Sequence, residues 1–225
     1  MTENERIHGV TTAGNYDHLI GDIVPGQSLL ISTILEYLPD NPRRILELGC
    51  GTGILTEMIL ARSPGARITG IDLSPDMLRV ASDKHELRNV DFIEEDLRSA
   101  WPSGPYDAIV TSLCLHHVSP EDRAEVMKRA CKALSPGGRF ICGDIFCGET
   151  DWEEQVFTAN WLQAMKKTGV PDDMINGMTV SRNERRPELR PISWFRNVLM
   201  EAGFSRGTTP FTAGFVGLVV GFAPE

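Results

Sequence analysis

The sequence predicts an α/β fold, in which a doubly wound, mostly parallel sheet of seven strands carries helices on both faces. Short apolar segments alternate with helical segments between residues 44 and 145, an alternation that requires right-handed crossovers and parallel strands. A glycine-rich turn follows the first of these strands, as it does in sheets that bind ligands at their carboxyl edge. Two strand-like segments near the end, 204–209 and 215–222, are joined by a short turn and predict a closing antiparallel β-hairpin.

The first strand and its turn read Arg-Ile-Leu-Glu-Leu-Gly-Cys-Gly-Thr-Gly over residues 44–53, and a helix is expected from Ile54 to Arg62. Glycines allow a tight turn and let a ligand approach the backbone closely. A dinucleotide fingerprint needs Gly or Ala at its last position, where Ile54 or Thr56 stands. A phosphate-binding P-loop needs Lys after its last glycine, and Ile54 follows instead. Both of these nucleotide-site classes are therefore excluded.

The second strand, Arg67 to Ile71, ends at Asp72, about 20 residues after the glycine turn, where doubly wound sheets place a carboxylate for ribose hydroxyls. An ionised carboxylate only accepts hydrogen bonds, so it can bind both hydroxyls of one ribose. Ser74 and Pro75 then predict a helix start.

The pattern acid-x-Gly-x-Gly-x-Gly at 47–53 resembles motif I of the class I S-adenosylmethionine-dependent methyltransferases, and residues 70–78 are similar to the second motif of that family. The resemblance covers most of the chain and implies a Rossmann-like fold, with S-adenosyl-L-methionine as cofactor and S-adenosyl-L-homocysteine as product. The cofactor-binding residues that it implies are Tyr16, Glu47, Gly49, Cys50, Gly51, Gly53, Asp72, Leu73, Met77, Asp96, Leu97 and Ser112.

Asp96 and Leu97 follow the third predicted strand, 90–94, where the family binds adenine. The fourth strand, 106–111, ends at Ser112 and leads to His116 and His117. A base is needed only if the acceptor arrives protonated, and imidazole titrates near neutral pH, so His117 is the candidate catalytic residue. A fifth strand is expected from Arg139 to Ile145 after a stop at 136–138.

Two segments lie outside the resemblance, within what is expected to be a single domain over residues 1–225. Residues 1–26 include helical spacing around Tyr16 and would form an N-terminal lid. Residues 146–190 form a helical insertion that would cap the acceptor site. Its apolar side chains and arginines suggest Trp161, Arg182 and Arg186 as substrate-binding residues and an anionic acceptor as a hypothesis.

The composition of the chain limits the kinds of partner and the cellular location that we expect. A net charge of −9 disfavours a long nucleic acid, since such partners need a basic surface. No apolar run approaches the ~20 residues of a membrane span, and residues 1–6 lack the features of a signal peptide. Five dispersed cysteines fit reduced thiols in a cytoplasmic protein. No metal site is predicted, and a homodimer is left open.

The expected function is direct methyl transfer to a small-molecule acceptor. One alternative is a tRNA wobble-uridine enzyme that uses a carboxylated cofactor, on loose similarity around Tyr16 and residues 201–204. The other is a non-catalytic cofactor-binding subunit, because the motifs concern binding and not turnover.

Overall fold

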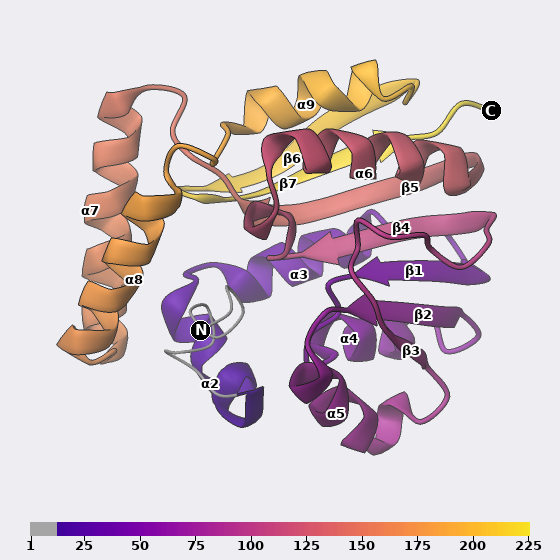
Figure 1. Ribbon diagram of the computed structural model, residues 1–225, viewed down its shortest axis with the longest axis horizontal. Coiled ribbons are helices and arrows are strands. Elements are labelled where there is room, and N and C mark those ends of the chain that lie inside the picture. Colours follow the sequence, from indigo (N-terminus) through magenta and orange to yellow (C-terminus); the bar gives the residue numbers. More distant parts are fainter. Residues whose placement is uncertain (1–12) are drawn as a thin grey trace.

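The computed structural model describes residues 13–225, whose centre is one seven-stranded sheet with the strand order β3-β2-β1-β4-β5-β7-β6 (Figure 1). Strands β1 to β5 are parallel, and β7 lies antiparallel between β5 and β6. The strands are β1 Arg44–Leu48, β2 Arg67–Asp72, β3 Asp91–Glu94, β4 Tyr106–Ser112, β5 Leu134–Ile145, β6 Arg206–Ala213 and β7 Val216–Phe222. The predicted fold class, including the closing hairpin, is confirmed.

Two strands, β5 and β6, differ from their predicted ranges by more than one residue. Strand β5 begins at Leu134 instead of Arg139, because Leu134 pairs with Tyr106 before an irregularity brings Arg139 opposite Ala108. The predicted stop at 136–138 is thus absorbed as a bulge within the strand. Strand β6 begins and ends later than residues 204–209, because its pairing with β7 extends to Ala213.

Helices cover both faces of the sheet (Figure 1). One buried cluster joins the sheet to α6 and α9, through side chains such as Val126 and Phe195, and a second joins it to α2, α3 and α4, through Ile20, Leu30 and Ile59. The helices are α2 Ala13–Ile23, α3 Gln27–Glu36, α4 Ile54–Arg62, α5 Pro75–Asp83, α6 Pro120–Ala133, α7 Asp151–Thr168, α8 Asp172–Arg185 and α9 Ile192–Glu201, with short 3₁₀ turns η1 His85–Leu87 and η2 Leu115–His117.

Helices α7 and α8 stand as a pair beyond the end of the sheet, outside its two helical layers (Figure 1). A capping box begins α7: Thr150 accepts from the backbone N–H of Glu153, whose side chain accepts from the N–H of Thr150. The two helices share a small buried cluster of Met165, Val170 and Ile175. Helix α8 runs to Arg185, so its last turn carries Arg182 and Arg185.

In residues 13–225, no single helix has both the length and the apolar character that crossing a membrane requires. The pair α2 and α3, bent by 93°, meets that test by length and composition alone. All five cysteines are free thiols.

Candidate active site

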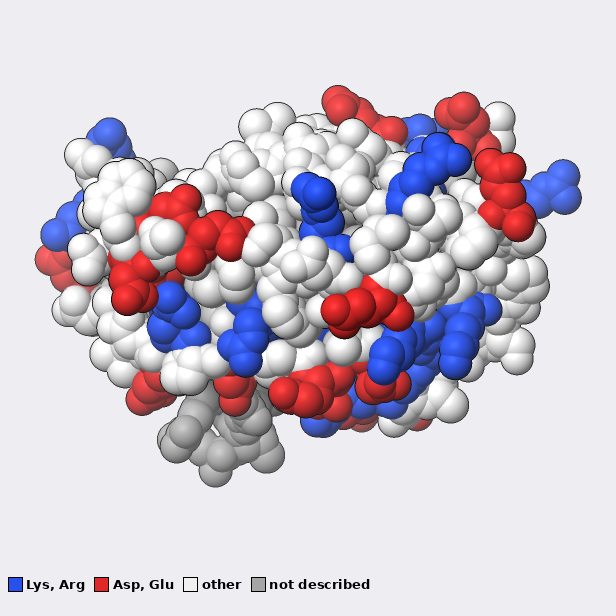
Figure 2. Space-filling model, turned by 90° about the horizontal axis from the view of Figure 1, so that it is seen from above, with Lys and Arg blue, Asp and Glu red and all other residues white. Residues whose placement is uncertain are grey.

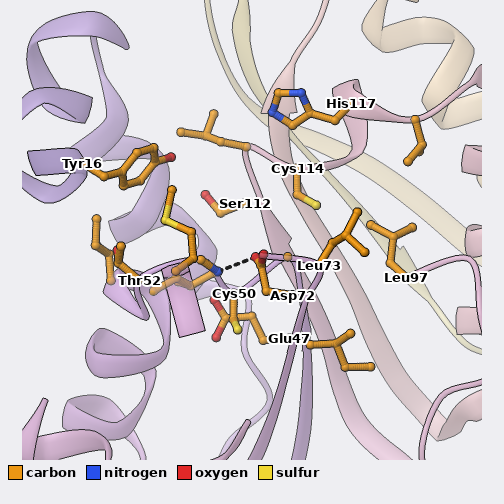
Figure 3. A pocket seen from close by; sticks show the side chains of 18 of the residues that line it. Tyr16, Glu47, Cys50, Thr52, Asp72, Leu73, Leu97, Ser112, Cys114 and His117 are labelled. Carbon is orange, nitrogen blue, oxygen red and sulfur yellow. Dashed lines mark hydrogen bonds between the residues drawn. The ribbon is translucent and has the colours of Figure 1, made fainter. Parts of the chain in front are cut away.

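A cavity of about 560 Å³ lies where β1, β2 and β4 end, at the carboxyl edge of the parallel strands (Figure 3). Its size falls within the range of small-molecule sites, about 300–1,000 Å³. The predicted cofactor residues that line it are Tyr16, Glu47, Gly49, Cys50, Gly51, Asp72, Leu73, Met77, Asp96, Leu97 and Ser112. Gly53 lies outside the lining, as the residue that precedes α4.

The glycine turn is held against β2 by its backbone. The N–H groups of Gly49 and Cys50 both donate to the carbonyl of Ile71, at 2.8 and 3.0 Å. Gly49 and Gly51 have φ values of 67° and 54°, which side chains rarely tolerate. A Cβ added at Gly51 would meet no atom within 4 Å, whereas one at Gly49 would lie 2.6 Å from Cβ of Cys114. Gly49 therefore gives room to a neighbour, and Gly51 is the residue whose open side leaves space for a ligand.

Asp72 links the turn to the second strand. Its Oδ2 accepts from the N–H of Gly51 and its Oδ1 from the N–H of Ser74, both at 2.8 Å (Figure 3). These two backbone bonds orient the carboxylate at the wall of the cavity. An ionised carboxylate only accepts hydrogen bonds, which suits ligand hydroxyls.

Glu47 is buried beneath the cavity, at the end of β1. Burial raises the pKa of its carboxyl from 4.5 to about 8, against the effect of a hydrogen bond from Thr56 Oγ1 at 2.6 Å, and the Asp72 carboxylate raises it further. Glu47 is thus a proton-bearing acid at neutral pH in the protein without ligands, and it can donate one hydrogen bond as well as accept.

This raised pKa predicts a pH-dependent stability. The folded state keeps a proton on Glu47 that the unfolded chain releases, so the free energy of unfolding falls as pH rises from 4.5 to about 8. Glu47→Gln, a neutral isostere, should flatten that decline. Urea unfolding of both proteins across this window measures it, with exposed Glu121→Gln as the charge-matched control. Identical pH slopes for wild type and Glu47→Gln would show that Glu47 ionises normally.

Asp96 lines the cavity, but its carboxylate is also bound within its own loop. Arg98 donates from Nε to Oδ2 at 2.9 Å and from Nη2 at 2.5 Å, and its backbone N–H bonds Oδ1 at 2.8 Å. This pairing with Arg98 lowers the pKa of Asp96, so the group is an ionised acceptor. The adenine role predicted for Asp96 stays a prediction, and Arg98 adds a pocket residue that the sequence did not single out.

Helix α2 closes one side of the cavity with Tyr16 (Figure 3). Burial, with nearby Cys114 and carboxylates, raises the pKa of the Tyr16 phenol, which therefore stays protonated. Asp17, the next residue, accepts from Thr52 Oγ1 in the glycine turn and from Lys84 Nζ at 2.7 Å. These contacts fasten α2 over the turn. Residues 1–12 of the predicted lid lie outside the described residues.

The two histidines of η2 have different partners. His116 bonds Oδ1 of buried Asp144 through Nδ1, at 2.5 Å, and its backbone N–H donates to the other carboxylate oxygen at 2.9 Å. His117 lines the cavity, and its Nδ1 lies 2.5 Å from Nη1 of Arg185 at the end of α8. The centroids of the two rings lie 3.9 Å apart, with the ring planes tilted by 42°. The catalytic role of His117 stays a prediction.

The three predicted substrate residues do not line this cavity. Trp161 donates through Nε1 to the carbonyl of Ile23, at 2.8 Å, and so joins α7 to α2. Arg182 is paired with Glu154 at 2.8 Å, with its guanidinium over the ring of Phe215. Arg186 also faces Glu154, at 3.5 Å. In this conformation the three side chains join α7 to α2, to α8 and to the residue that follows α8.

Within residues 13–225, no cluster of three or more His, Cys, Asp or Glu residues has the geometry of a metal site.

The glycine turn, the carboxylate after the second strand and the cavity between them lie together at the carboxyl edge of the parallel strands. Residues 45–138 match the family described as Methyltransferase domain. Over these residues the chain is similar to that domain, and its fold is that of the class I S-adenosylmethionine-dependent methyltransferases.

Curated relatives agree with this assignment. A demethylmenaquinone methyltransferase of Thermus thermophilus is 36% identical over 103 residues, which are 44% of this chain and 46% of that protein. A trans-aconitate 2-methyltransferase of Rhodopseudomonas palustris is 37% identical over 106 residues, 47% of this chain and 40% of that protein. The chain thus spans less than half the length of each of these relatives.

Solved structures share the fold over nearly the whole chain. The N-methyltransferase NodS from Bradyrhizobium japonicum, in complex with S-adenosyl-L-homocysteine, has a TM-score of 0.67 at 16% identity and covers 98% of this chain and 99% of its own. An N-methyltransferase of Haemonchus contortus, in complex with phosphomonomethylethanolamine and S-adenosylhomocysteine, has a TM-score of 0.71 at 15% identity, covering 98% and 59%.

Proposed function

We propose that this chain is an enzyme that transfers a methyl group from S-adenosyl-L-methionine directly to a small-molecule acceptor. The observation that carries the proposal is the bond from the N–H of Gly51 to Asp72, which places an open glycine backbone and an oriented carboxylate on the same side of one cavity. The cofactor supplies a methyl group already activated by its sulfonium, so no covalent enzyme intermediate is required.

The chain's own residues would bind and orient the two reactants. Asp72 accepts the ribose hydroxyls, Asp96 and Leu97 bind the adenine, and the turn around Gly51 contacts the amino-acid portion. Tyr16, fastened in place through Asp17, covers the cavity and excludes water, which favours in-line transfer.

The domain assignment is part of this proposal. Residues 1–26 would act as a lid, and residues 146–190 would build the outer wall of the acceptor site, because α8 reaches the cavity through Arg185 and His117. With Trp161, Arg182 and Arg186 engaged inside the cap, their contribution to acceptor choice would be indirect, by shaping and placing α7 and α8.

The two alternatives receive no better support. The curated relatives named above methylate menaquinone precursors or trans-aconitate by their names, which favours a small molecule over tRNA. Basic and acidic side chains alternate over the face drawn in Figure 2, without the continuous basic stripe typical of nucleic-acid binders. A cytoplasmic location and a homodimer stay predictions. Methyl transfer to any member of a small-molecule panel would exclude the non-catalytic alternative, and copurified tRNA would favour the wobble-uridine alternative.

Removing the Asp72 carboxylate tests the cofactor site. Asp72→Ala loses a charged acceptor for two hydroxyls, so the affinity for S-adenosylhomocysteine should fall by about 1.5–3 kcal/mol, roughly tenfold to a hundredfold. Gly51→Val should weaken binding further, because a branched side chain would occupy the open space. Titration calorimetry measures both, with exposed Asp76→Ala as the charge-matched control. Wild-type affinity in Asp72→Ala would disprove this assignment.

A further inference from the structure

The polar groups of the cavity are divided between its two ends. The acidic side chains that line it, Glu47, Asp72, Glu95 and Asp96, belong to the ends of β1 and β2 and to the loop after β3. Tyr16 of α2 and His117 of η2 also line it, and each can donate a hydrogen bond. Figure 3 shows His117 on the far side of the cavity from Glu47 and Asp72. His117 is therefore a hydrogen-bonding group set apart from those two acids.

The contact with Arg185 determines which donor His117 offers. A guanidinium has five N–H donors and no acceptor. The Arg185 Nη1 atom lies 2.5 Å from Nδ1 of His117, so Nδ1 must present its lone pair and the ring proton must be on Nε2. The second Arg185 nitrogen, Nη2, bonds the backbone carbonyl of His117 at 3.5 Å, which orients the guanidinium along the same residue.

Asp144 imposes the opposite arrangement on the neighbouring ring. Its carboxylate accepts from Nδ1 of His116, which therefore carries the proton there. Among the groups around His117 in residues 13–225 are Arg185 from α8, the tilted ring of His116, and Asp144 of β5 behind that ring. Arg123 of α6 bonds the η2 carbonyls, and Cys114 and Tyr16 stand in the cavity wall. Two adjacent histidines are thus fixed in different tautomers by two partners from different elements.

We propose that Arg185 is a positioning residue, which holds His117 as the neutral Nε2–H tautomer so that His117 binds an oxygen anion of the acceptor as a hydrogen-bond donor. In this tautomer, Nε2 already carries a proton and Nδ1 faces a cation, so neither nitrogen can act as the general base. The arrangement therefore suits an acceptor that arrives without a proton to lose, as a carboxylate or an ionised phenol does. Such an oxygen brings its own electron pair to the methyl carbon, the carbon–sulfur bond breaks, and the sulfur keeps that bond's electron pair. No proton has to move.

The inference about the acceptor rests on the proposed methyl transfer, whereas the tautomer of His117 does not depend on that proposal. The tautomer is therefore measured first, on the protein alone. Long-range proton–nitrogen NMR of histidine-labelled protein, assigned with His117→Gln, should show the neutral Nε2–H pattern for His117. Arg185→Ala should release it to a mixture of tautomers. Arg185→Lys, which keeps a donor-only cation, should retain the wild-type pattern. A wild-type His117 that is Nδ1–H or doubly protonated would overturn the proposal, as would Arg185→Ala with an unchanged pattern.

The acceptor class is tested on protein saturated with S-adenosylhomocysteine, at slightly alkaline pH, with benzoate and 4-nitrophenolate as the two oxygen-anion probes and benzylamine as a cationic probe. At least one anion should shift the His117 Nε2–H signal, and the responding probe distinguishes a carboxylate from a phenolate site. The affinity for that probe should fall about tenfold in Arg185→Ala and stay unchanged in Arg196→Ala, which changes an exposed arginine of α9.

A His117 signal that only benzylamine shifts, or that neither anion shifts, would overturn the acceptor class. A failure of S-adenosylhomocysteine to bind wild type at all would instead refute the proposed function and leave the tautomer result standing.

Discussion

Gly49→Ala is expected to weaken the binding of S-adenosylhomocysteine by about a hundredfold or more, an effect of ~3 kcal/mol. The added Cβ would lie 2.6 Å from Cβ of Cys114 and closer still to its sulfur, at a residue whose φ is +67°. Strained φ adds about 1–2 kcal/mol and overpacking about 1–3 kcal/mol, so the free energy of unfolding should fall by roughly 2–5 kcal/mol. The turn can relieve the clash only by moving away from β4, and that movement displaces Gly51 from Asp72.

The steric part of this effect can be separated from the backbone part. Cys114→Gly in the Gly49→Ala background removes both clashing atoms and should restore about 1–3 kcal/mol of stability together with much of the affinity. Gly51→Ala has a similar positive φ but no atom within 4 Å of the added Cβ, so it isolates the cost of φ. Urea unfolding and calorimetry of this set measure both quantities. Equal losses in the single and double variants would refute the steric account of Gly49.

The sequence was sufficient for the part of the site that is local along the chain. Glu47, the glycine turn and Asp72 stand at the ends of consecutive strands, and parallel strands bring such ends to one edge of the sheet. Spacing and the family resemblance together therefore predicted that Glu47, the glycine turn and Asp72 would meet at the cavity. The same reasoning predicted the hairpin, because its two strands are joined by a short turn.

Contacts between distant elements could not be predicted in this way. Lys84 reaches Asp17 across 67 positions, and Arg182 reaches Glu154 across 28, with no periodicity that links either pair. A cluster of arginines in an acidic chain suggested an anionic ligand, but carboxylates of α7 bind Arg182 and Arg186. Only the fold decides whether such a charge meets a ligand or a neighbouring helix.

The same limitation applied to Arg123, which sits in the sequence as an ordinary helix residue and is 1% exposed in the structure. Its Nε bonds the carbonyl of Leu115 at 2.8 Å, and its Nη2 that of His116 at 3.3 Å. Its Nη1 bonds the carbonyl of Glu188 at 2.9 Å, beyond the end of α8. One buried side chain thus connects α6 to η2 and to the segment that leads into α9. Burial lowers the pKa of the guanidinium, and the Asp144 carboxylate opposes that effect.

Arg123→Met is therefore expected to lower the free energy of unfolding by about 3–5 kcal/mol, because it removes a buried donor from three carbonyls, of which that of Leu115 keeps only the N–H of Val118. Methionine fills much of the same volume, so the loss would be mainly polar and not a cavity effect. Arg129→Met on the same helix is the matched control, since Arg129 also bonds carbonyls but is only half-buried, and it should cost about 1 kcal/mol. Urea unfolding compares the stabilities of the two variants.

Because η2 carries both histidines, Arg123→Met should also broaden the NMR signals of the His116 and His117 rings in the folded protein, while Arg129→Met should leave them sharp. Equal stability losses for the two variants would mean that the η2 carbonyls find other donors and that Arg123 does not anchor the site.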